Sequence, residues 1–489
     1  MSVTTAWLED EARRLLSFGA AAALPDGGAA YLDEFGVPDL TQGIQAWITC
    51  RTVHSFALGH LLGVSGANEV AKAALAGLWG QGAVLRDTEH GGWFNVVSAD
   101  GTPDPTADKL AYDHAFVMLA GASATIAGIE GGAELLTEAC AVYLEKFWDD
   151  AAGRPIDTWN ADFTKADPYR GLNSTMHSIE ALLTVANAVP AKEAPAWLDR
   201  AERAASFVVD LAAAHNGRLP EHFGPDWVAD LELNKDRPGD RFKPYGATPG
   251  HGFEWARLLL HLEAALASPM VDPAETTGSP SVILRERSES QNPAPLPLSA
   301  TTFASVPCAQ NDVRGELLPT AIALFDRAVA DAWAADGADG FAYTTGWDGI
   351  PVVRARMHWV VCEAIATAHV LHERTGEQRF ADWYERFVEY AKKYLLDQEH
   401  GSWHHELDSD NRPAATVWPG KPDIYHALQC VLIPRLPLFP MLPAAMAAGS
   451  LLPAASFCAS VSESLAPAPD APTLGSATSL RSAQNDAFI

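Results

Sequence analysis

A glycine-centred turn signal recurs along this chain at intervals of about sixty residues. Asp87-Thr-Glu-His-Gly91-Gly-Trp93 is echoed by Asp397-Gln-Glu-His-Gly401-Ser-Trp403. Related signals, each a glycine after a polar cluster and before aromatic or proline residues, lie at Gly28, Gly153, Gly217 and Gly340. By subtraction of residue numbers, the six glycines are 63, 62, 64, 123 and 61 residues apart. Such a period holds two helices and their connections, because helices average about a dozen residues, so six units predict about twelve helices.

The stretches between these turns are rich in Ala, Leu and Glu at helical spacing. Residues 120–147, 175–189, 197–214 and 357–373 are examples that we predict to form amphipathic helices. Six helical hairpins that close on themselves make an (α/α)6 barrel, whereas hairpins that stay open make a solenoid. We favour the closed, all-α barrel because polar motifs gather at several unit boundaries, as they would at a barrel mouth.

The long interval of 123 residues contains a stretch, from about 270 to 316, that loses the helical pattern and gains Pro and Ser. This stretch recurs at the C-terminus with a constant offset of 174 residues. Ser288-Glu-Ser290 matches Ser462-Glu-Ser464, and Ala309-Gln-Asn-Asp312 matches Ala483-Gln-Asn-Asp486. Neither copy has the composition of a packed core. We therefore predict one barrel domain over residues 1–448, interrupted by a low-complexity insert at about 270–316 and followed by a low-complexity tail at 449–489.

The charge balance limits the partners of the chain. With 34 Lys and Arg against 62 Asp and Glu, the formal charge of −28 argues against nucleic acid and anionic membranes, which both need basic surface. No apolar run reaches the roughly 20 residues of a membrane span. Glu9, Asp10 and Glu11 stand where a signal peptide would be basic and then apolar. The six cysteines form no Cys-x-x-Cys pair. We expect a cytoplasmic protein, a monomer or small homo-oligomer, that handles neutral or weakly charged solutes.

Two short segments place a histidine among residues suited to proton transfer. They are Pro249-Gly-His251-Gly-Phe-Glu-Trp255 and Trp418-Pro-Gly-Lys-Pro-Asp-Ile-Tyr-His426. Gly and Pro break regular structure beside each histidine, which predicts a position at a loop-to-helix junction. Histidine titrates nearest neutral pH, at about 6.5 when unperturbed, so two imidazoles facing one pocket can serve as acid and base. The alternative is a pair of ordinary capping or core histidines.

Together with four further motifs, these segments resemble the N-acylglucosamine 2-epimerase superfamily, and within it the mannose isomerase and sulfoquinovose isomerase branch. The further motifs are Arg51-Thr-Val-His-Ser-Phe-Ala-Leu-Gly-His60, Tyr112-Asp-His-Ala-Phe116, Tyr169-Arg-Gly-Leu-Asn-Ser-Thr-Met-His177 and Arg356-Met-His-Trp359. All of them follow the family order between about residues 10 and 440. The resemblance implies the (α/α)6 barrel, a sugar substrate, and acid–base roles for His251 and His426.

The implied reaction requires two proton movements. An aldose becomes a ketose when one proton passes between C2 and C1 and another between the two oxygens, through a cis-enediol(ate). A general base and a general acid each contribute roughly 10²–10⁴-fold. His177 resembles a third family histidine that assists ring opening or binding. Arg51 resembles a pocket arginine that stabilises enediolate charge, with a structural ion pair as its alternative. We expect Glu254 to orient His251 or to bind a sugar hydroxyl, unless it faces solvent.

The other predicted substrate-binding residues are aromatic, amide and carboxylate side chains, which suit the apolar faces and hydroxyls of a sugar: Tyr112, Asn173, Trp359, Trp418 and Asp423. His54, His114 and His358 are either ligands or helix-packing residues on the sequence alone. We predict that His404 and His405 lie at the surface.

Motifs for other chemistries are absent from the sequence. It contains no His-Glu-x-x-His, no EF-hand loop, no dense carboxylate cluster and no phosphate-binding Gly-x-x-x-x-Gly-Lys-Ser/Thr loop, so we predict neither a metal nor another cofactor. His251 with Glu254 could still form half of a metal site. The predicted function is aldose–ketose isomerisation, foremost of D-mannose and D-fructose. Three alternatives stay open: a 2-epimerase acting on an N-acylated hexosamine or another sugar, a glycoside hydrolase using Glu254 and Asp423, and a non-catalytic sugar- or protein-binding module.

Overall fold

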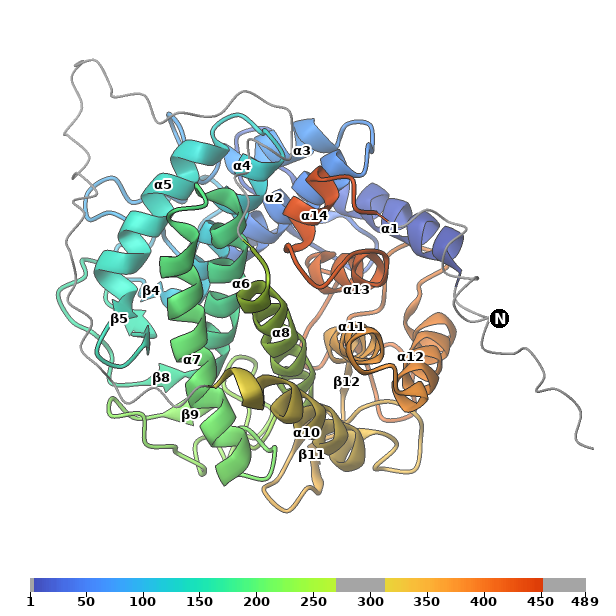
Figure 1. Cartoon of the computed structure of the whole chain (residues 1–489). Coiled ribbons are helices and arrows are strands. Elements are labelled where there is room, and N and C mark those ends of the chain that lie inside the picture. The colour runs from blue at the N-terminus through green and yellow to red at the C-terminus, as the bar shows by residue number, and fades with distance from the viewer. Residues whose placement is uncertain (1–3, 270–312, 452–489) are drawn as a thin grey trace, which may run out of the picture.

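The structure is a computed structural model that describes residues 4–269 and 313–451. Almost all of the predicted insert, and the predicted tail after residue 451, lie outside the described residues. Helices dominate the described part, and its strands are short (Figure 1).

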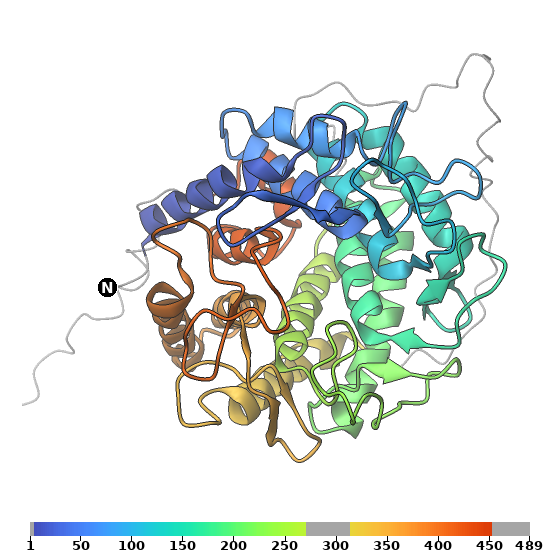
Figure 2. The same cartoon turned by 180° about the vertical axis from the view of Figure 1, so that it is seen from behind.

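Six helices form a closed inner ring. They are α2 (Ala46–Leu61), α4 (Ala111–Ile126), α6 (Leu172–Ala188), α8 (Pro249–Ala267), α11 (His358–Thr375) and α13 (Tyr425–Leu432). Each helix packs against the next along the chain, and α13 packs against α2, which closes the ring (Figures 1 and 2). The closed barrel is therefore confirmed over the open solenoid.

Six outer helices each cover one inner helix. They are α3 (Ala67–Leu75) on α2, α5 (Gly132–Val142) on α4, α7 (Ala194–Ala214) on α6, α10 (Arg314–Ala332) on α8, α12 (Gln378–Tyr390) on α11 and α1 (Thr5–Gly19) on α13. The short α14 (Leu442–Ala447) packs on α2, α4 and α6. No helix of the described part is long and apolar enough to span a bilayer.

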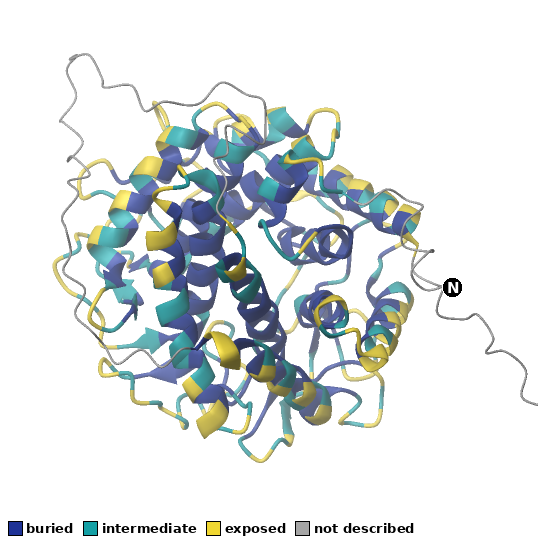
Figure 3. Cartoon of the chain, in the orientation of Figure 1, coloured by how far each residue is buried: buried dark blue, intermediate teal, exposed yellow. Residues whose placement is uncertain are grey.

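The two rings differ in amphipathicity. The inner helices are apolar nearly all round and are almost wholly buried, as Figure 3 shows. The outer helices are amphipathic: α12 buries Phe380, Tyr384, Phe387, Val388 and Tyr390 on one face and exposes charged residues on the other. An apolar stripe on each outer helix thus packs against the inner ring, and the polar faces point to solvent.

The six turn glycines all lie in loops that run from an outer helix to the next inner helix. Their φ values are positive, between 67° at Gly153 and 112° at Gly340. This left-handed region favours glycine because it has no Cβ. The sixty-residue period is therefore the helical-hairpin period of the barrel. The segment 120–147, predicted as one helix, is instead divided between α4 and α5, because Gly128 and Gly131 both adopt positive φ there.

Short strands occupy the same loops and lead into the inner helices. The strands are β1 (Ala30–Leu32), β2 (Pro38–Gln45), β3 (Val96–Val97), β4 (Lys109–Leu110), β5 (Trp148–Asp149), β6 (Arg154–Pro155), β7 (Thr158–Trp159), β8 (Arg170–Gly171), β9 (His222–Phe223), β10 (Thr344–Thr345), β11 (Pro351–Val353), β12 (Arg356–Met357) and β13 (Glu406–Leu407). All pairs are antiparallel, in the order β1-β2-β3, β4-β7, β5-β6, β8-β9, β10-β11 and β12-β13. β2, β4, β8 and β12 end where α2, α4, α6 and α11 begin, so the ladders fix the N-terminal ends of these helices.

Single-turn segments complete the described structure. They are the 3-10 turns η1 (Ala20–Ala22) and η4 (Ile433–Arg435) and the π-helical turns η2 (Tyr143–Phe147) and η3 (Ala391–Leu395). The two π-helical turns end α5 and α12, at equivalent places in the repeat.

Candidate active site

The predicted site residues gather at the N-terminal ends of the inner helices. Two equivalent positions supply most of them. The second helical residue is Tyr112 in α4, Asn173 in α6, Trp359 in α11 and His426 in α13, and the sixth is Arg51 in α2, His177 in α6, Glu254 in α8 and Glu363 in α11. His251 is the third residue of α8. Equivalent positions on neighbouring helices thus form two layers at one end of the barrel.

Each of the two predicted catalytic histidines has a carboxylate partner on Nδ1. Nδ1 of His251 lies 2.8 Å from Oε1 of Glu221, and Nδ1 of His426 lies 2.8 Å from Oε1 of Glu363. A carboxylate at Nδ1 holds the proton there and leaves Nε2 free to accept one. The ring of Trp359 contacts both imidazoles, with centroid distances of 5.1 Å to His251 and 5.8 Å to His426. The two histidines therefore face one region across one tryptophan.

Burial decides the charge state of His426. Burial lowers the pKa of His426 below its usual value, although the Glu363 carboxylate opposes this shift. The imidazole is therefore neutral at neutral pH, as a general base requires. Burial alone would raise the pKa of Glu363, but the charge of Arg257 and the bond to His426 outweigh it and lower that pKa.

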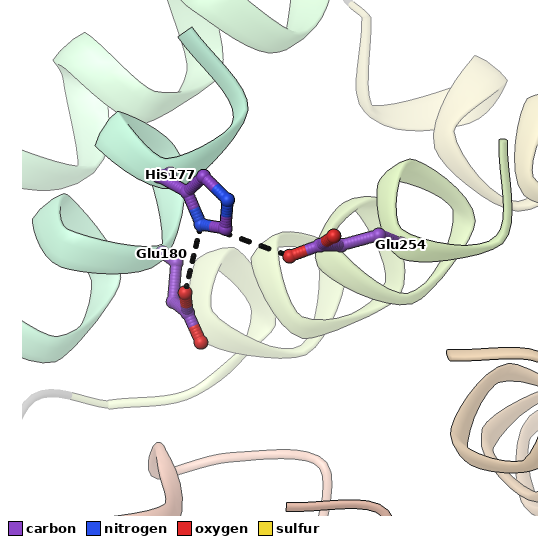
Figure 4. Close-up of side chains that lie close together, drawn as sticks. All are labelled: His177, Glu180 and Glu254. Atoms are coloured by element: carbon purple, nitrogen blue, oxygen red, sulfur yellow. Dashed lines mark hydrogen bonds and ion pairs between the residues drawn. The ribbon is translucent and has the colours of Figure 1, made fainter. Parts of the chain in front are cut away.

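A buried cluster of His177, Glu180 and Glu254 adjoins His426 and Glu363 (Figure 4). Nδ1 of His177 is 3.5 Å from Oε2 of Glu180 and 3.7 Å from Oε1 of Glu254. Burial lowers the pKa of His177 to about 4, and burial with the nearby Glu363 raises the pKa of Glu254 well above its usual range. At neutral pH the imidazole of His177 is therefore neutral, and the raised pKa of Glu254 favours its protonated form. Glu254 is buried, so the solvent-facing alternative is wrong, and Glu221, not Glu254, orients His251.

Arg257 supplies the positive charge of this cluster. Its Nε donates to Oε2 of Glu363 at 2.9 Å, and its Nη2 lies 3.7 Å from Oε1 of Glu254.

Two sets of side chains have metal-ligand spacing, with ligand atoms within 4.8 Å of one another: His177 with Glu180 and Glu254, and Glu254 with Glu363 and His426. The carboxylates, however, already face a buried guanidinium, and Glu180 accepts hydrogen bonds from Tyr425 and Gln429. This donor set fits an internal polar network better than a divalent cation.

Arg51 is fixed in the pocket by charge and by aromatic rings. Its Nη1 donates to Oδ2 of Asp423 at 3.1 Å, and its Nη2 donates to the hydroxyl of Tyr112 at 3.0 Å. Its guanidinium lies 4.6 Å from the ring centroid of Phe116 and 4.5 Å from that of Tyr425. Burial alone would raise the pKa of Asp423, but Arg51 lowers it, so the pair is ionised. A permanent cation is thus held rigidly among these side chains.

Aromatic residues line the outer part of the site. The ring of Trp418 contacts that of Trp47, the second residue of α2, at 6.3 Å, and Arg241 stacks over Trp418 at 4.1 Å. Asn173 places a buried amide oxygen, without a hydrogen-bond partner in the described part of the chain, in the same layer as Tyr112. The predicted binding residues are therefore brought to one end of the barrel.

His54 and His114, and His358 with His405, lie in different surroundings. His54 bonds to Ser123 and His114 bonds to the backbone of Leu110 and Trp93, so both are helix-packing residues. His405 was predicted at the surface, and this is wrong: its ring is buried and stacks on His358 at 3.7 Å. The physical reason is the pairing of β13 with β12, which carries His405 beneath the start of α11.

Three functional side chains are not found by the motifs: Glu221, Glu363 and Arg257. Glu363 had a signal in the sequence, because it occupies the same sixth helical position as Arg51, His177 and Glu254. Glu221 had none, since its partner lies 30 residues away, in the first turn of α8.

Comparisons with known proteins identify the family of this chain. The family model described as N-acylglucosamine 2-epimerase matches residues 27–277 and 303–430. A D-mannose isomerase from Thermobifida fusca is 44% identical over 444 residues, which cover 90% of this chain and 97% of that protein. A D-mannose isomerase from Pseudomonas cannabina pv. alisalensis is 40% identical over 442 residues, covering 90% and 95%.

Solved structures share the fold. A D-mannose isomerase structure superposes with a TM-score of 0.71 at 23% identity, covering 88% of this chain and 97% of that one. The cellobiose 2-epimerase from Spirochaeta thermophila DSM 6192 follows with 0.67 at 20%, covering 88% and 96%. The chain therefore belongs to the N-acylglucosamine 2-epimerase family, and within it to the enzymes that isomerise an aldose and its ketose.

Proposed function

We propose that this isomerase interconverts D-mannose and D-fructose by proton transfer at His251 and His426. The observation that carries the proposal is the pair of imidazoles, each with a carboxylate on Nδ1 and both in ring contact with Trp359. The relatives that are 44% and 40% identical are both D-mannose isomerases, which supports this sugar pair.

In the proposed reaction, one imidazole takes the C2 proton of the open-chain aldose and returns it to C1. The other carries the hydroxyl proton from O2 to O1, so that the C1 carbonyl becomes a hydroxyl and C2 becomes the carbonyl. Between these steps the enediolate bears negative charge on oxygen, and Arg51 is a permanent cation whose charge acts on His426. Preorganised positive charge of this kind stabilises the transition state because it needs no reorganisation during the reaction.

His177 and Glu254 support an earlier step, the opening of the sugar ring. The raised pKa of Glu254 favours its protonated form, and its Oε1 lies 3.7 Å from Nδ1 of the neutral His177. A neutral acid beside a neutral base can deliver one proton and remove another, as ring opening requires at the ring oxygen and at the anomeric hydroxyl. The same two groups are suited to hydrogen-bond sugar hydroxyls.

The test is to incubate the pure protein with D-mannose in D₂O and to follow the products by NMR. We expect D-fructose with partial deuterium at C1, because a histidine base exchanges its proton with solvent before returning it. Formation of D-glucose without D-fructose would favour the 2-epimerase, and the absence of any product would reject both. D-fructose without deuterium would reject the enediol path in favour of a hydride shift.

Activity is expected to be independent of metal ions. The two sets of residues with metal-ligand spacing already share the guanidinium of Arg257, and Arg51 supplies positive charge at the reacting oxygens. Dialysis against EDTA should leave kcat unchanged. A loss of activity that Mg²⁺, Mn²⁺ or Co²⁺ restores would contradict this scheme.

A further inference from the structure

The side chain of Lys421 is buried although it lies in the loop that carries His426. Its Nζ donates to Oδ2 of Asp397 at 2.6 Å and to the backbone carbonyl of Gly401 at 2.8 Å. The other oxygen of Asp397 accepts the backbone N–H groups of Glu399 and His400, at 2.9 and 3.0 Å. One carboxylate therefore ties the glycine turn of this repeat unit to the loop in front of α13.

We call this arrangement of an aspartate, a lysine and a glycine turn a latch. A second latch lies on another part of the ring. Nζ of Lys109 donates to Oδ2 of Asp87 at 2.6 Å and to the carbonyl of Gly91 at 2.7 Å. Oδ1 of Asp87 accepts the N–H groups of residues 89 and 90 at 2.9 and 3.0 Å. The two latches stand on the two turn motifs that are most alike in the sequence, and their bond lengths agree within 0.1 Å.

The two latches hold different kinds of backbone. Lys109 belongs to β4, which pairs with β7 and runs directly into α4, so the ladder fixes this segment even without the lysine. Residues 414–424, in contrast, form neither helix nor strand. The backbone N–H of Lys421 donates to the carbonyl of Leu32 at 3.0 Å. The backbone N–H of Ala414 donates to the carbonyl of Glu406 at 3.0 Å, and side chains otherwise hold this segment.

Besides the bond of Arg51 to Asp423, further anchors act along residues 416–426, which we call the catalytic segment. Glu406 accepts the backbone N–H groups of Thr416, Val417 and Trp418, at 3.0, 2.8 and 2.8 Å. The imidazole of His405 bonds to the backbone of Asp423. Lys421 lies between these anchors, five residues before His426, and is the one residue of this stretch whose side chain reaches into the neighbouring turn.

We propose that Asp397 and Lys421 are positioning residues that set the place of His426 opposite Trp359. This inference rests on the proposed role of His426. A displacement of about 1 Å at a reacting group can lower the rate about a hundredfold, so a loop without a ladder needs such an anchor. The latch of Asp87 and Lys109, which stands beside a ladder, is expected to serve stability alone.

The test replaces each latch by an uncharged pair of similar shape. Asp397→Asn with Lys421→Met removes both charges together, because leaving one buried charge unpaired would destabilise the fold by itself. Asparagine also keeps an oxygen for the N–H groups of residues 399 and 400. Asp87→Asn with Lys109→Met is the matched control, since it removes the same bonds from the same turn type. Both double variants are measured for Tm, kcat and KM, and both are combined with His426→Asn.

We expect the two double variants to lose similar amounts of thermal stability. Replacement of Asp397 and Lys421 should lower kcat at least tenfold with KM changed less than threefold, while the control keeps kcat within about threefold. In the His426→Asn background, the same replacement should lower kcat less than twofold further, because the group that it positions is gone.

Two results would overturn the inference. One is an equal loss of kcat in both double variants, which would assign the latch to stability alone. The other is an undiminished effect in the His426→Asn background, which would show that the latch does not act through His426. Full activity of His426→Asn by itself would instead reject the proposed function, so the two failures are distinguishable.

Discussion

At the scale of single residues, the two pocket imidazoles depend on acidic partners that are distant in sequence. We predict that His251→Asn and His426→Asn each lower kcat at least about a hundredfold while circular dichroism shows an intact fold, as loss of a general acid or base should. His372→Asn is the control, because His372 lies in the last turn of α11 and bonds to the backbone of Glu377. A variant at His251 or His426 with near-normal kcat would remove that histidine from the mechanism.

Asp113 is a buried carboxyl group whose two oxygens have no hydrogen-bond partner among the described residues. Burial raises its pKa from 3.8 to about 8. Because the folded value is the higher one, the group destabilises the fold progressively as pH rises from about 4 to about 8, and not below that window. Asp113→Asn should therefore raise Tm at pH 9 relative to the parent and leave it nearly unchanged at pH 4. Equal shifts of Tm at both pH values would show that the carboxyl group is not the cause.

Some residues of the site could be predicted from local motifs, and their partners from distant parts of the chain could not. His251 and His426 could be predicted because each lies in a local motif beside a Gly, Pro or aromatic residue, and Arg51 and His177 because their motifs resemble those of the family. Glu221 could not, because it meets His251 across 30 residues of chain, from the loop between α7 and α8. Glu363 carries a positional signal, but its contact with His426 spans 63 residues and depends on the packing of α11 against α13. His405 was misplaced for a similar reason: its burial depends on a strand pairing that leaves no mark in the local sequence.

At the scale of elements, the inner helices approach each other closely at their N-terminal ends. A Cβ on Gly250 would lie 2.5 Å from Cζ3 of Trp359 and 2.7 Å from Cγ2 of Val360, so this position of α8 admits no side chain. A Cβ on Gly252 would lie 3.7 Å from Cβ of Ala328, an ordinary contact. Gly250 thus allows the close approach of α8 and α11, whereas Gly252 is not needed for that contact.

We predict that Gly250→Ala lowers kcat about tenfold and also lowers Tm, because it displaces the tryptophan between the two histidines. Gly252→Ala is the matched control and should keep kcat. Its Tm should stay the same or rise, since alanine in a helix is more stable than glycine by about 0.5–1 kcal/mol. Steady-state kinetics and thermal unfolding of both variants are the measurements. A harmless Gly250→Ala would mean that Trp359 can shift without affecting the chemistry.

At the scale of the whole molecule, closure of the ring joins the two ends of the barrel domain. α1 is the outer partner of α13, Arg14 donates to the backbone carbonyls of Asp397 and Ser402, and Trp403 donates to Glu11. The N-terminal helix thus braces the turn that holds the catalytic segment. The sequence period predicts this architecture because each unit repeats the same glycine turn, while the pairing of the first helix with the last unit follows only from closure.

The last prediction concerns the stretch that interrupts the repeat between α8 and α10. α8 ends at Ala267, α10 begins at Arg314, and the two helices pack against each other as one hairpin of the barrel. The family match breaks over residues 278–302, within this stretch. The stretch lies outside the described residues and is duplicated near the C-terminus at an offset of 174 residues.

Loop length enters the free energy of folding only as a logarithm, so a hairpin tolerates a long connection at small entropic cost and gains little by keeping it. Removal of residues 272–312 and of all residues after 451 should therefore preserve kcat and KM and leave Tm equal or higher. Deleting each stretch separately is the control, because either one alone should behave as the double deletion does. Loss of soluble expression after a deletion would show that the removed stretch packs against the barrel and that the sixty-residue period alone does not define the folding unit.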